Sequence, residues 1–204
     1  MDIPESAMQE TSMPVDDYLK VGLHIGTKSR TKDMRPFIYK MRPDGLSVLN
    51  VQRISERLQL AAKMIASYDL EDVVIFCRRE NGWRPAQKFS EITGIRSFRG
   101  RYLPGILTNP KLGNFIEAKL IFVCDPFPDK NAVEDAARIG IPLIALCDTN
   151  NTISNVDLAL PCNNKGKRSL ALVFWILARE ILKLKGLIAK DADFKYTLED
   201  FSPE

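Results

Sequence analysis

Apolar runs and segments of helical periodicity alternate along this chain. Continuous runs rich in β-branched and aromatic residues, such as DVVIFC, are typical of strands that are buried on both faces of a sheet. The runs expected to form strands cover 46–50, 72–77, 118–124, 141–147 and 156–161. The periodic segments predict helices over 51–68, 84–93, 131–140 and 169–186. This alternating order predicts an α/β fold with a doubly wound, mostly parallel five-stranded sheet and helices on both faces.

Local signals at the ends of these elements refine the prediction. The link 148–155 is too polar and too short for a crossover helix, so the pattern leaves the direction of the fifth strand open. Asn50 or Ser55 is expected to cap the first helix, and Ser169 the last. Gly94 and Gly186 are expected to end their helices.

The two ends of the chain differ in composition from its middle. Residues 1–17 hold five acids and no base, which predicts an acidic N-terminal tail. A mixed, acidic segment over 187–204 predicts a second tail, leaving one domain over 18–186. The first residues lack the basic and apolar regions of a secretory signal, and the run 170–178 is too short to cross a bilayer. We therefore expect a soluble, intracellular protein.

The cysteines follow the expected strands. Each lies near a strand end and none forms a CxxC pair: Cys77, Cys124, Cys147 and Cys162. Such cysteines are most often small apolar core residues, so reduced thiols in a cytosolic protein are expected. A zinc site is not expected, because the spacing is wrong and the only histidine, His24, is distant in sequence.

Positive charge is concentrated in three stretches. Residues 28–42 hold six bases and one acid, 78–101 hold seven bases and two acids, and 165–168 hold three bases. Aromatic residues interleave with the arginines, and this combination favours contacts with RNA phosphates and exposed bases over a merely solvated face. The candidate RNA-binding residues are Lys28, Arg30, Lys32, Arg35, Tyr39, Arg42, Arg78, Arg79, Arg84, Arg96, Arg99, Arg101, Lys165, Lys167 and Arg168.

The loop PCNNKGKRS, residues 161–169, approaches a phosphate-binding P-loop but does not match it. Pro161 stands where the first glycine belongs, and Arg168 stands where the Mg²⁺-binding hydroxyl belongs. Two interpretations remain. The basic side chains at a helix N-terminus suit an anion, whereas Asn163 and Asn164 suit a turn that caps the helix.

Catalytic chemistry finds little support in the sequence. The junction between the first expected strand and its helix, LNVQRISER (49–57), lacks the glycines of a dinucleotide site. Asp125 and Asp148 each follow a strand, but both stand in turn contexts where aspartate commonly binds backbone N–H groups. His24 lies between apolar neighbours and is expected to be packed or hydrogen-bonded rather than catalytic.

Four longer blocks of the sequence resemble a known family. They are the segments 18–66, 100–110 (GRYLPGILTNP), 120–150 and 156–182, the last with Pro-Cys-Asn-Asn-Lys-Gly followed by Trp175 and Ala178-Arg179-Glu180. In order and spacing they are similar to the second small-subunit ribosomal protein family, which includes the laminin-receptor-like ribosomal proteins of eukaryotes. The sequence lacks the helical insertion of bacterial members and the long C-terminal extension of eukaryotic members. In both respects it resembles the archaeal type.

This resemblance implies a flavodoxin-like domain on the solvent side of the small ribosomal subunit, in the cytoplasm. It implies binding to small-subunit ribosomal RNA and neighbouring ribosomal proteins, with no catalysis, cofactor, nucleotide or membrane. Two other classes stay open on the residues. One is a nucleotide- or phosphometabolite-binding enzyme using Asp125, Asp148 and Lys167, and the other is a protein-interaction module using the acidic 1–17 tail.

Overall fold

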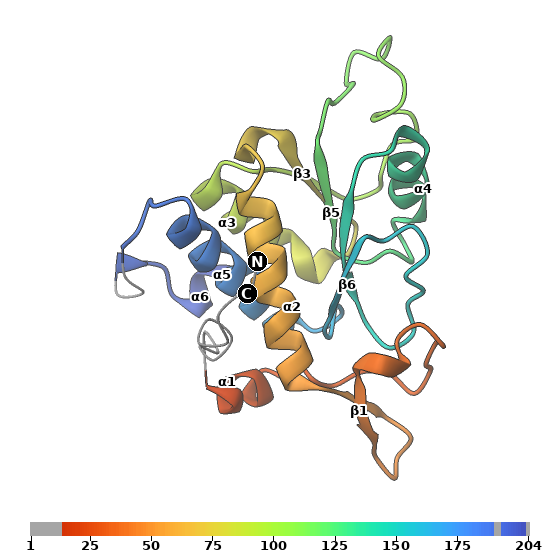
Figure 1. The fold of residues 1–204 in the computed structure, drawn as a ribbon, viewed down its shortest axis with the longest axis vertical. Coiled ribbons are helices and arrows are strands. Elements are labelled where there is room, and N and C mark those ends of the chain that lie inside the picture. Colours follow the sequence, from red (N-terminus) through yellow and green to blue (C-terminus); the bar gives the residue numbers. More distant parts are fainter. Residues whose placement is uncertain (1–13, 190–192, 203–204) are drawn as a thin grey trace, which may run out of the picture.

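A parallel sheet of five strands forms the centre of the protein (Figure 1). The computed structural model describes residues 14–189 and 193–202. The strands stand in the order β4 (Arg96–Arg99), β3 (Val73–Cys77), β5 (Leu120–Val123), β6 (Leu143–Cys147) and β7 (Leu158–Pro161). The last strand is parallel to its neighbour, with Cys147 opposite Pro161. The predicted doubly wound α/β fold is therefore confirmed, and the open direction of the fifth strand is settled.

Helices cover both faces of this sheet. The contacts of α5 (Lys167–Leu184) with α2 (Val51–Ala66) and with α3 (Trp83–Thr93) place these three helices on one face, and α4 (Lys130–Ile139) lies on the other (Figure 1). Instead of a helix, the long connection 100–119 joins β4 to β5. Several of its apolar side chains are buried, among them Ile106, Leu107 and Ile116.

One predicted strand belongs to a different sheet. Residues 46–50 contain β2 (Ser47–Leu49), which pairs antiparallel with β1 (Ile38–Met41) in a two-stranded hairpin. The prediction that 46–50 is a strand of the main sheet is therefore wrong. The remaining strand of the main sheet is β4, which was not predicted because its sequence RSFR has no continuous apolar run. As an edge strand it leaves its first and last arginines exposed.

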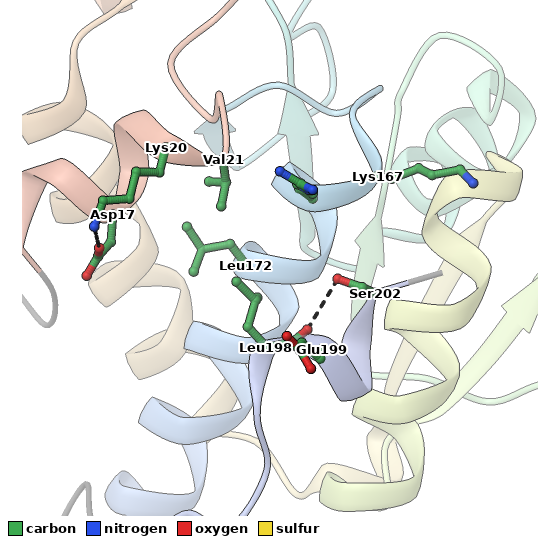
Figure 2. Close-up of a pocket in the computed structure, with 9 residues that line it drawn as sticks. Asp17, Lys20, Val21, Lys167, Leu172, Leu198, Glu199 and Ser202 are labelled. Carbon is green, nitrogen blue, oxygen red and sulfur yellow. Dashed lines mark hydrogen bonds and ion pairs between the residues drawn. The ribbon is translucent and has the colours of Figure 1, made fainter. Parts of the chain in front are cut away.

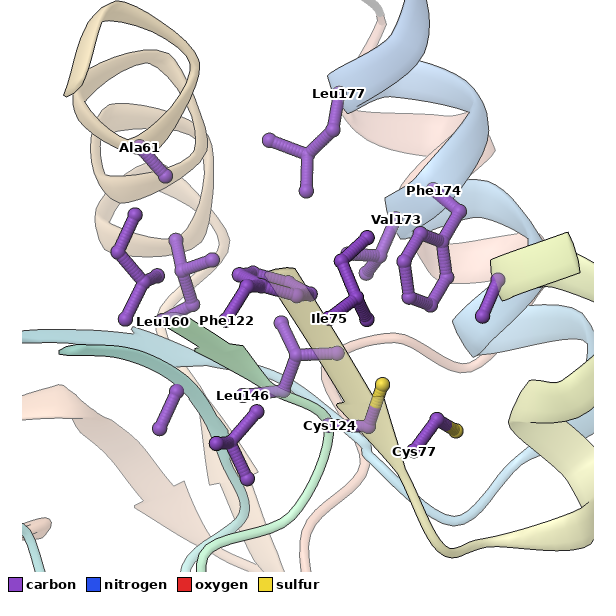
Figure 3. Packing of buried hydrophobic residues seen from close by; sticks show 14 of the residues in the cluster. Ala61, Ile75, Cys77, Phe122, Cys124, Leu146, Leu160, Val173, Phe174 and Leu177 are labelled. Atoms are coloured by element: carbon purple, nitrogen blue, oxygen red, sulfur yellow. The ribbon is translucent and has the colours of Figure 1, made fainter. Parts of the chain in front are cut away.

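The core lies mainly between the sheet and α5. Figure 3 shows Ile75 and Phe122 of the sheet close to Val173 and Phe174 of α5. The rings of Phe122 and Phe174 meet edge to face at 5.8 Å, a favoured aromatic geometry. All four cysteines are buried free thiols, as the core interpretation predicts.

The helix ends test the capping predictions. Asn50 caps α2, because its side chain accepts hydrogen bonds from the N–H groups of Gln52 and Arg53, whereas Ser55 lies inside the helix. Gly94 follows α3 at a positive φ of 78°. Ser169 is not the N-cap of α5: the cap position is Gly166, and the Ser169 hydroxyl donates to the Asn163 carbonyl at 2.6 Å. Gly186, with a positive φ of 71°, ends this last helical segment as expected.

Both flanking segments contribute described residues to the packing. Most of the acidic stretch 1–17 lies outside the described residues, but α1 (Val15–Lys20) buries Tyr18. Within 187–204, α6 (Leu198–Phe201) contacts α5 and buries Phe201 fully. The indole N–H of Trp175 donates to the Tyr196 carbonyl at 2.9 Å. The described residues also include the short 3-10 helices η2 (Arg35–Phe37), η3 (Leu70–Asp72) and η4 (Glu80–Gly82).

Candidate nucleic-acid interface

Two buried carboxylates lie in the loops at the carboxyl edge of the sheet. Asp125 follows β5 and Asp148 follows β6, and each is 1% exposed. Asp125 pairs with the guanidinium of Arg79, and Asp148 accepts a hydrogen bond from the Lys165 ammonium at 2.7 Å. A buried charge is tolerated only when it is paired and hydrogen-bonded. These two aspartates therefore hold Arg79 and Lys165 in place across the edge of the sheet.

Two buried amides connect these carboxylates. The Asn151 amide donates to Asp125 at 2.9 Å, and its oxygen accepts from the Asp148 backbone N–H at 2.7 Å. Asn164 donates to the same Asn151 oxygen at 3.1 Å and to the Leu146 carbonyl at 2.9 Å. Asn164 therefore joins the loops that follow β6 and β7, and the prediction that it caps α5 is wrong.

Asn163 does build the turn that precedes α5. Its side-chain oxygen accepts hydrogen bonds from the backbone N–H groups of Lys165 at 3.1 Å and Gly166 at 3.0 Å. In a P-loop, backbone N–H groups of this kind cradle the phosphates. Here they are bound by a side chain of the same loop, so this geometry supports the turn interpretation of Asn163.

The third basic stretch divides at Gly166. Lys165 points to Asp148 and also donates to the Asn150 side-chain oxygen at 2.8 Å. Lys167 and Arg168 are exposed and line a pocket of about 610 Å³ between α1, α5 and α6 (Figure 2). Lys20 and the acidic side chains of Asp17 and Glu199 line the same pocket, which is therefore of mixed charge.

The first basic stretch is fixed above the end of β6. The Thr31 N–H donates to the Thr149 carbonyl at 2.9 Å, and the Thr27 N–H donates to the Thr149 hydroxyl at 2.9 Å. Gly26 is required at this contact, because a Cβ there would lie 2.5 Å from the Thr149 methyl group. The stretch 28–42 begins at this anchor and leaves six candidates exposed: Lys28, Arg30, Lys32, Arg35, Tyr39 and Arg42.

The second basic stretch has residues at the carboxyl ends and at the amino ends of the strands. The side chain of Arg78, which follows β3, donates to the Pro128 carbonyl at 3.0 Å but is exposed. Arg96 begins β4 at the opposite, amino edge and donates to the carbonyls of Glu71 at 3.0 Å and Glu117 at 2.8 Å. At the carboxyl end of β4, Arg99 donates to Gln87 at 2.7 Å. The remaining exposed candidates of this stretch are Arg84 and Arg101.

Two lysines that were not candidates share these surfaces. Lys40 lies on β1 with its ammonium 6.0 Å from the centroid of the Tyr39 ring. Lys20 lines the pocket beside Lys167. Lys40 belongs to the basic run 28–42, which was a usable signal. Lys20 stands alone after an acidic segment, and only the packing of α1 reveals its neighbours.

The titratable groups of the interior are shifted by burial. Burial raises the pKa of Asp129 to about 6, although the carboxylate accepts a hydrogen bond from the Arg78 N–H at 3.3 Å. Burial likewise raises the thiol pKa of Cys124, Cys147 and Cys162, so these thiols stay protonated and weakly nucleophilic at neutral pH.

Within the described ranges, 14–189 and 193–202, no cluster of three or more His, Cys, Asp or Glu side chains could hold a metal ion. The helices in this part of the chain include none that is long and apolar enough to span a bilayer.

These features define a doubly wound α/β domain whose edge carboxylates bind its own loops and whose surface displays exposed cations. Comparison with known proteins specifies the family. Residues 115–183 match the family model described as ribosomal protein S2. Several curated relatives, each named small ribosomal subunit protein uS2, align along nearly the whole chain. The protein of Nanoarchaeum equitans is 47% identical over 192 residues, covering 94% of this chain and 96% of its own length.

Two further relatives agree with this match. The protein of Picrophilus torridus is 48% identical over 193 residues, covering 95% of this chain and 96% of its own length. The protein of Thermoplasma volcanium is 47% identical over 196 residues, covering 96% and 98%. The chain therefore belongs to the ribosomal protein S2 family, whose members are structural and not enzymes. The predicted family and its archaeal type are confirmed, and the enzyme alternative is set aside.

Proposed function

We propose that this protein is a structural component of the small ribosomal subunit in the cytoplasm. In this role it binds small-subunit ribosomal RNA and neighbouring ribosomal proteins, supporting subunit assembly and translation without catalysis. The names of its relatives support the ribosomal role.

The observation that carries the RNA-binding proposal is the anchoring of exposed cations above the carboxyl edge of the sheet. The contacts of Thr27 and Thr31 with Thr149 fix the start of the first basic stretch there. Arg78 stands exposed beyond β3 on the same edge. Several cations on one surface can neutralise successive phosphates, which supplies most of the sequence-independent affinity for RNA.

The contacts of the candidates divide them into two groups. Arg79 and Lys165 pair with buried carboxylates, and Arg96 joins two backbone carbonyls at the amino edge, so we assign these three to the stability of the domain. The other twelve are exposed in the structure, and we assign them to RNA contacts. They are Lys28, Arg30, Lys32, Arg35, Tyr39, Arg42, Arg78, Arg84, Arg99, Arg101, Lys167 and Arg168.

Neighbouring ribosomal proteins are the second class of partner in this proposal. The acidic segment 1–17 is complementary to a basic protein surface, and most of it lies outside the described residues. Loss of residues 1–13, which hold three acids and no base, should therefore not weaken RNA binding.

Salt-dependent binding to purified small-subunit ribosomal RNA tests the proposal. A variant with Lys28→Gln, Arg30→Gln and Lys32→Gln should bind more weakly than the wild type. Its plot of log affinity against log salt should also be less steep by roughly 0.7–0.9 for each phosphate that the protein no longer neutralises. The matched control is Lys63→Gln, Lys111→Gln and Lys119→Gln, which removes the same charge from exposed positions away from the carboxyl edge of the sheet. Equal slopes for the two variants would refute the assignment of this surface.

A further inference from the structure

A groove of about 610 Å³ lies between the β1–β2 hairpin, α1 and the start of α2. Its volume is within the range of roughly 300–1,000 Å³ that small-molecule sites occupy. Apolar and polar side chains both line it, including Leu19, Val48, Tyr39, Lys40, Arg42 and Gln52. A surface that only contacts phosphates does not need such a groove. Phosphate binding alone therefore does not explain the lining of this groove.

Tyr39 is the most exposed aromatic side chain of this lining. It is 69% exposed, on an edge strand of only four residues. The register of the hairpin shifts between Ile38 and Lys40, so Tyr39 stands at a β-bulge. Bulges redirect a side chain away from regular pairing and recur beside functional sites. The bulge therefore explains how this ring is presented at the groove and not packed in the core.

Cations share the groove and the hairpin with this ring. The Lys40 ammonium lies 6.0 Å from the centroid of the Tyr39 ring, and Arg42 lines the same groove. Arg42 is held by an ion pair with Asp44 at 3.1 Å in the hairpin turn. The side chain of Lys28 lies near this turn, with its Cγ 4.0 Å from the Cβ position of Gly45. The groove thus combines an open aromatic ring with positive charge.

This combination matches a nucleotide better than a peptide strand. An unpaired base stacks on an aromatic ring while nearby cations bind the phosphates beside it. Gln52, exposed in the first turn of α2, adds an amide that can hydrogen-bond a base edge. Lysine on an exposed edge strand, as at position 40, discourages the addition of another strand.

We propose that this groove binds one unpaired nucleotide of RNA, with its base stacked on Tyr39 and its phosphates contacted by Lys40 and Arg42. This inference rests on the proposed function, because the RNA surface must first be engaged. It goes beyond that function by assigning single-stranded or looped-out RNA, and not a regular duplex, to the hairpin.

The test compares Tyr39→Ala and Tyr39→Phe with the wild type on three probes. These are small-subunit ribosomal RNA, single-stranded oligoadenylate, and the same oligoadenylate paired with oligouridylate. Stacking on one aromatic ring corresponds to roughly 5- to 150-fold in affinity. Tyr39→Ala should therefore weaken binding to the single strand by about this factor and leave duplex binding within about twofold. Tyr39→Phe keeps the ring and should bind as the wild type does.

The outcomes separate this inference from the proposed function. The stacking site alone would be overturned if the wild type binds ribosomal RNA and Tyr39→Ala binds oligoadenylate as tightly as the wild type does. Equal weakening on single strand and duplex, or wild-type binding to ribosomal RNA without binding to oligoadenylate, would do the same. No binding of the wild type to ribosomal RNA at low salt would overturn the proposed function and this inference with it. Circular dichroism should show that both variants fold, because the Tyr39 side chain is mostly exposed.

Discussion

Replacing Arg79 with glutamine should destabilise the domain. The molecules that remain folded should bind RNA as strongly as the wild type does. Arg79 pairs with Asp125, which is 1% exposed and would keep its charge in a buried site. Removing one partner of a fully buried ion pair costs about 3–5 kcal/mol. Two features reduce this cost. The Arg79 side chain is 31% exposed, and Asp125 keeps hydrogen bonds from the Phe127 N–H at 3.0 Å and Asn151 at 2.9 Å.

We therefore expect Arg79→Gln to lower the free energy of unfolding by about 2–3 kcal/mol. In a chain of this size that loss corresponds to a decrease in melting temperature of about 4–12 °C. Urea and thermal unfolding, followed by circular dichroism, measure both quantities. The matched control is Arg78→Gln, because Arg78 is the adjacent arginine, is exposed, and donates to a single carbonyl, that of Pro128. Its loss should cost less than about 1 kcal/mol.

A double variant isolates the pair itself. Asp125→Asn removes the buried charge, so Arg79→Gln should cost far less in that background than in the wild type. The reasoning fails if Arg79→Gln is as stable as the wild type and loses affinity for ribosomal RNA as Arg78→Gln does. In that case Arg79 would be an RNA ligand, and its contact with Asp125 would have no structural role.

Two further variants test other parts of the structure. Burial raises the pKa of Asp129 to about 6 from an ordinary value of 3.8, so the folded state holds this proton more tightly than the unfolded chain. The stability that results is present below pH 4 and is lost as the pH rises through 6, by up to about 3 kcal/mol. As the pH rises through this interval, the free energy of unfolding of Asp129→Asn, measured with urea, should therefore increase relative to that of the wild type. If the unfolding free energies of the two proteins change with pH in parallel, the argument is contradicted. Phe201→Ala should lower the free energy of unfolding by about 3 kcal/mol, because this ring is fully buried. A change within about 0.5 kcal/mol would mean that α6 does not pack on the domain in solution.

The buried strands could be predicted because each is a continuous apolar run. DVVIFC and LIFV mark two interior strands of the sheet, β3 and β5, without any knowledge of their partners. β4 could not be predicted in this way, because an edge strand keeps only part of its surface in the core and RSFR carries two arginines. The segment 46–50 is recognisable as a strand, but its sheet depends on pairing with β1 and on an isolated bridge from Ile25 to Val48.

The candidate site was predictable in its charge and not in its contacts. Counting bases identifies the three basic stretches, because charge clustering is a local property of the sequence. The partners of Arg79 and Lys165 lie 46 and 17 residues away, so only the fold brings them together. Likewise, Asn163 and Asn164 are adjacent in a turn, yet one binds the loop itself and the other binds the end of β6. Local propensity cannot distinguish such neighbours, because their roles follow from the direction of each side chain.

The most direct test of the central claim is co-sedimentation of the tagged protein with small ribosomal subunits from cells, after a wash at moderate salt. The wild type should stay in the small-subunit fraction. The Lys28, Arg30 and Lys32 variant should be largely released, whereas the Lys63, Lys111 and Lys119 control should be retained. A wild-type protein that remains at the top of the gradient, or equal retention of the two variants, would contradict an RNA-binding surface at the carboxyl edge of the sheet.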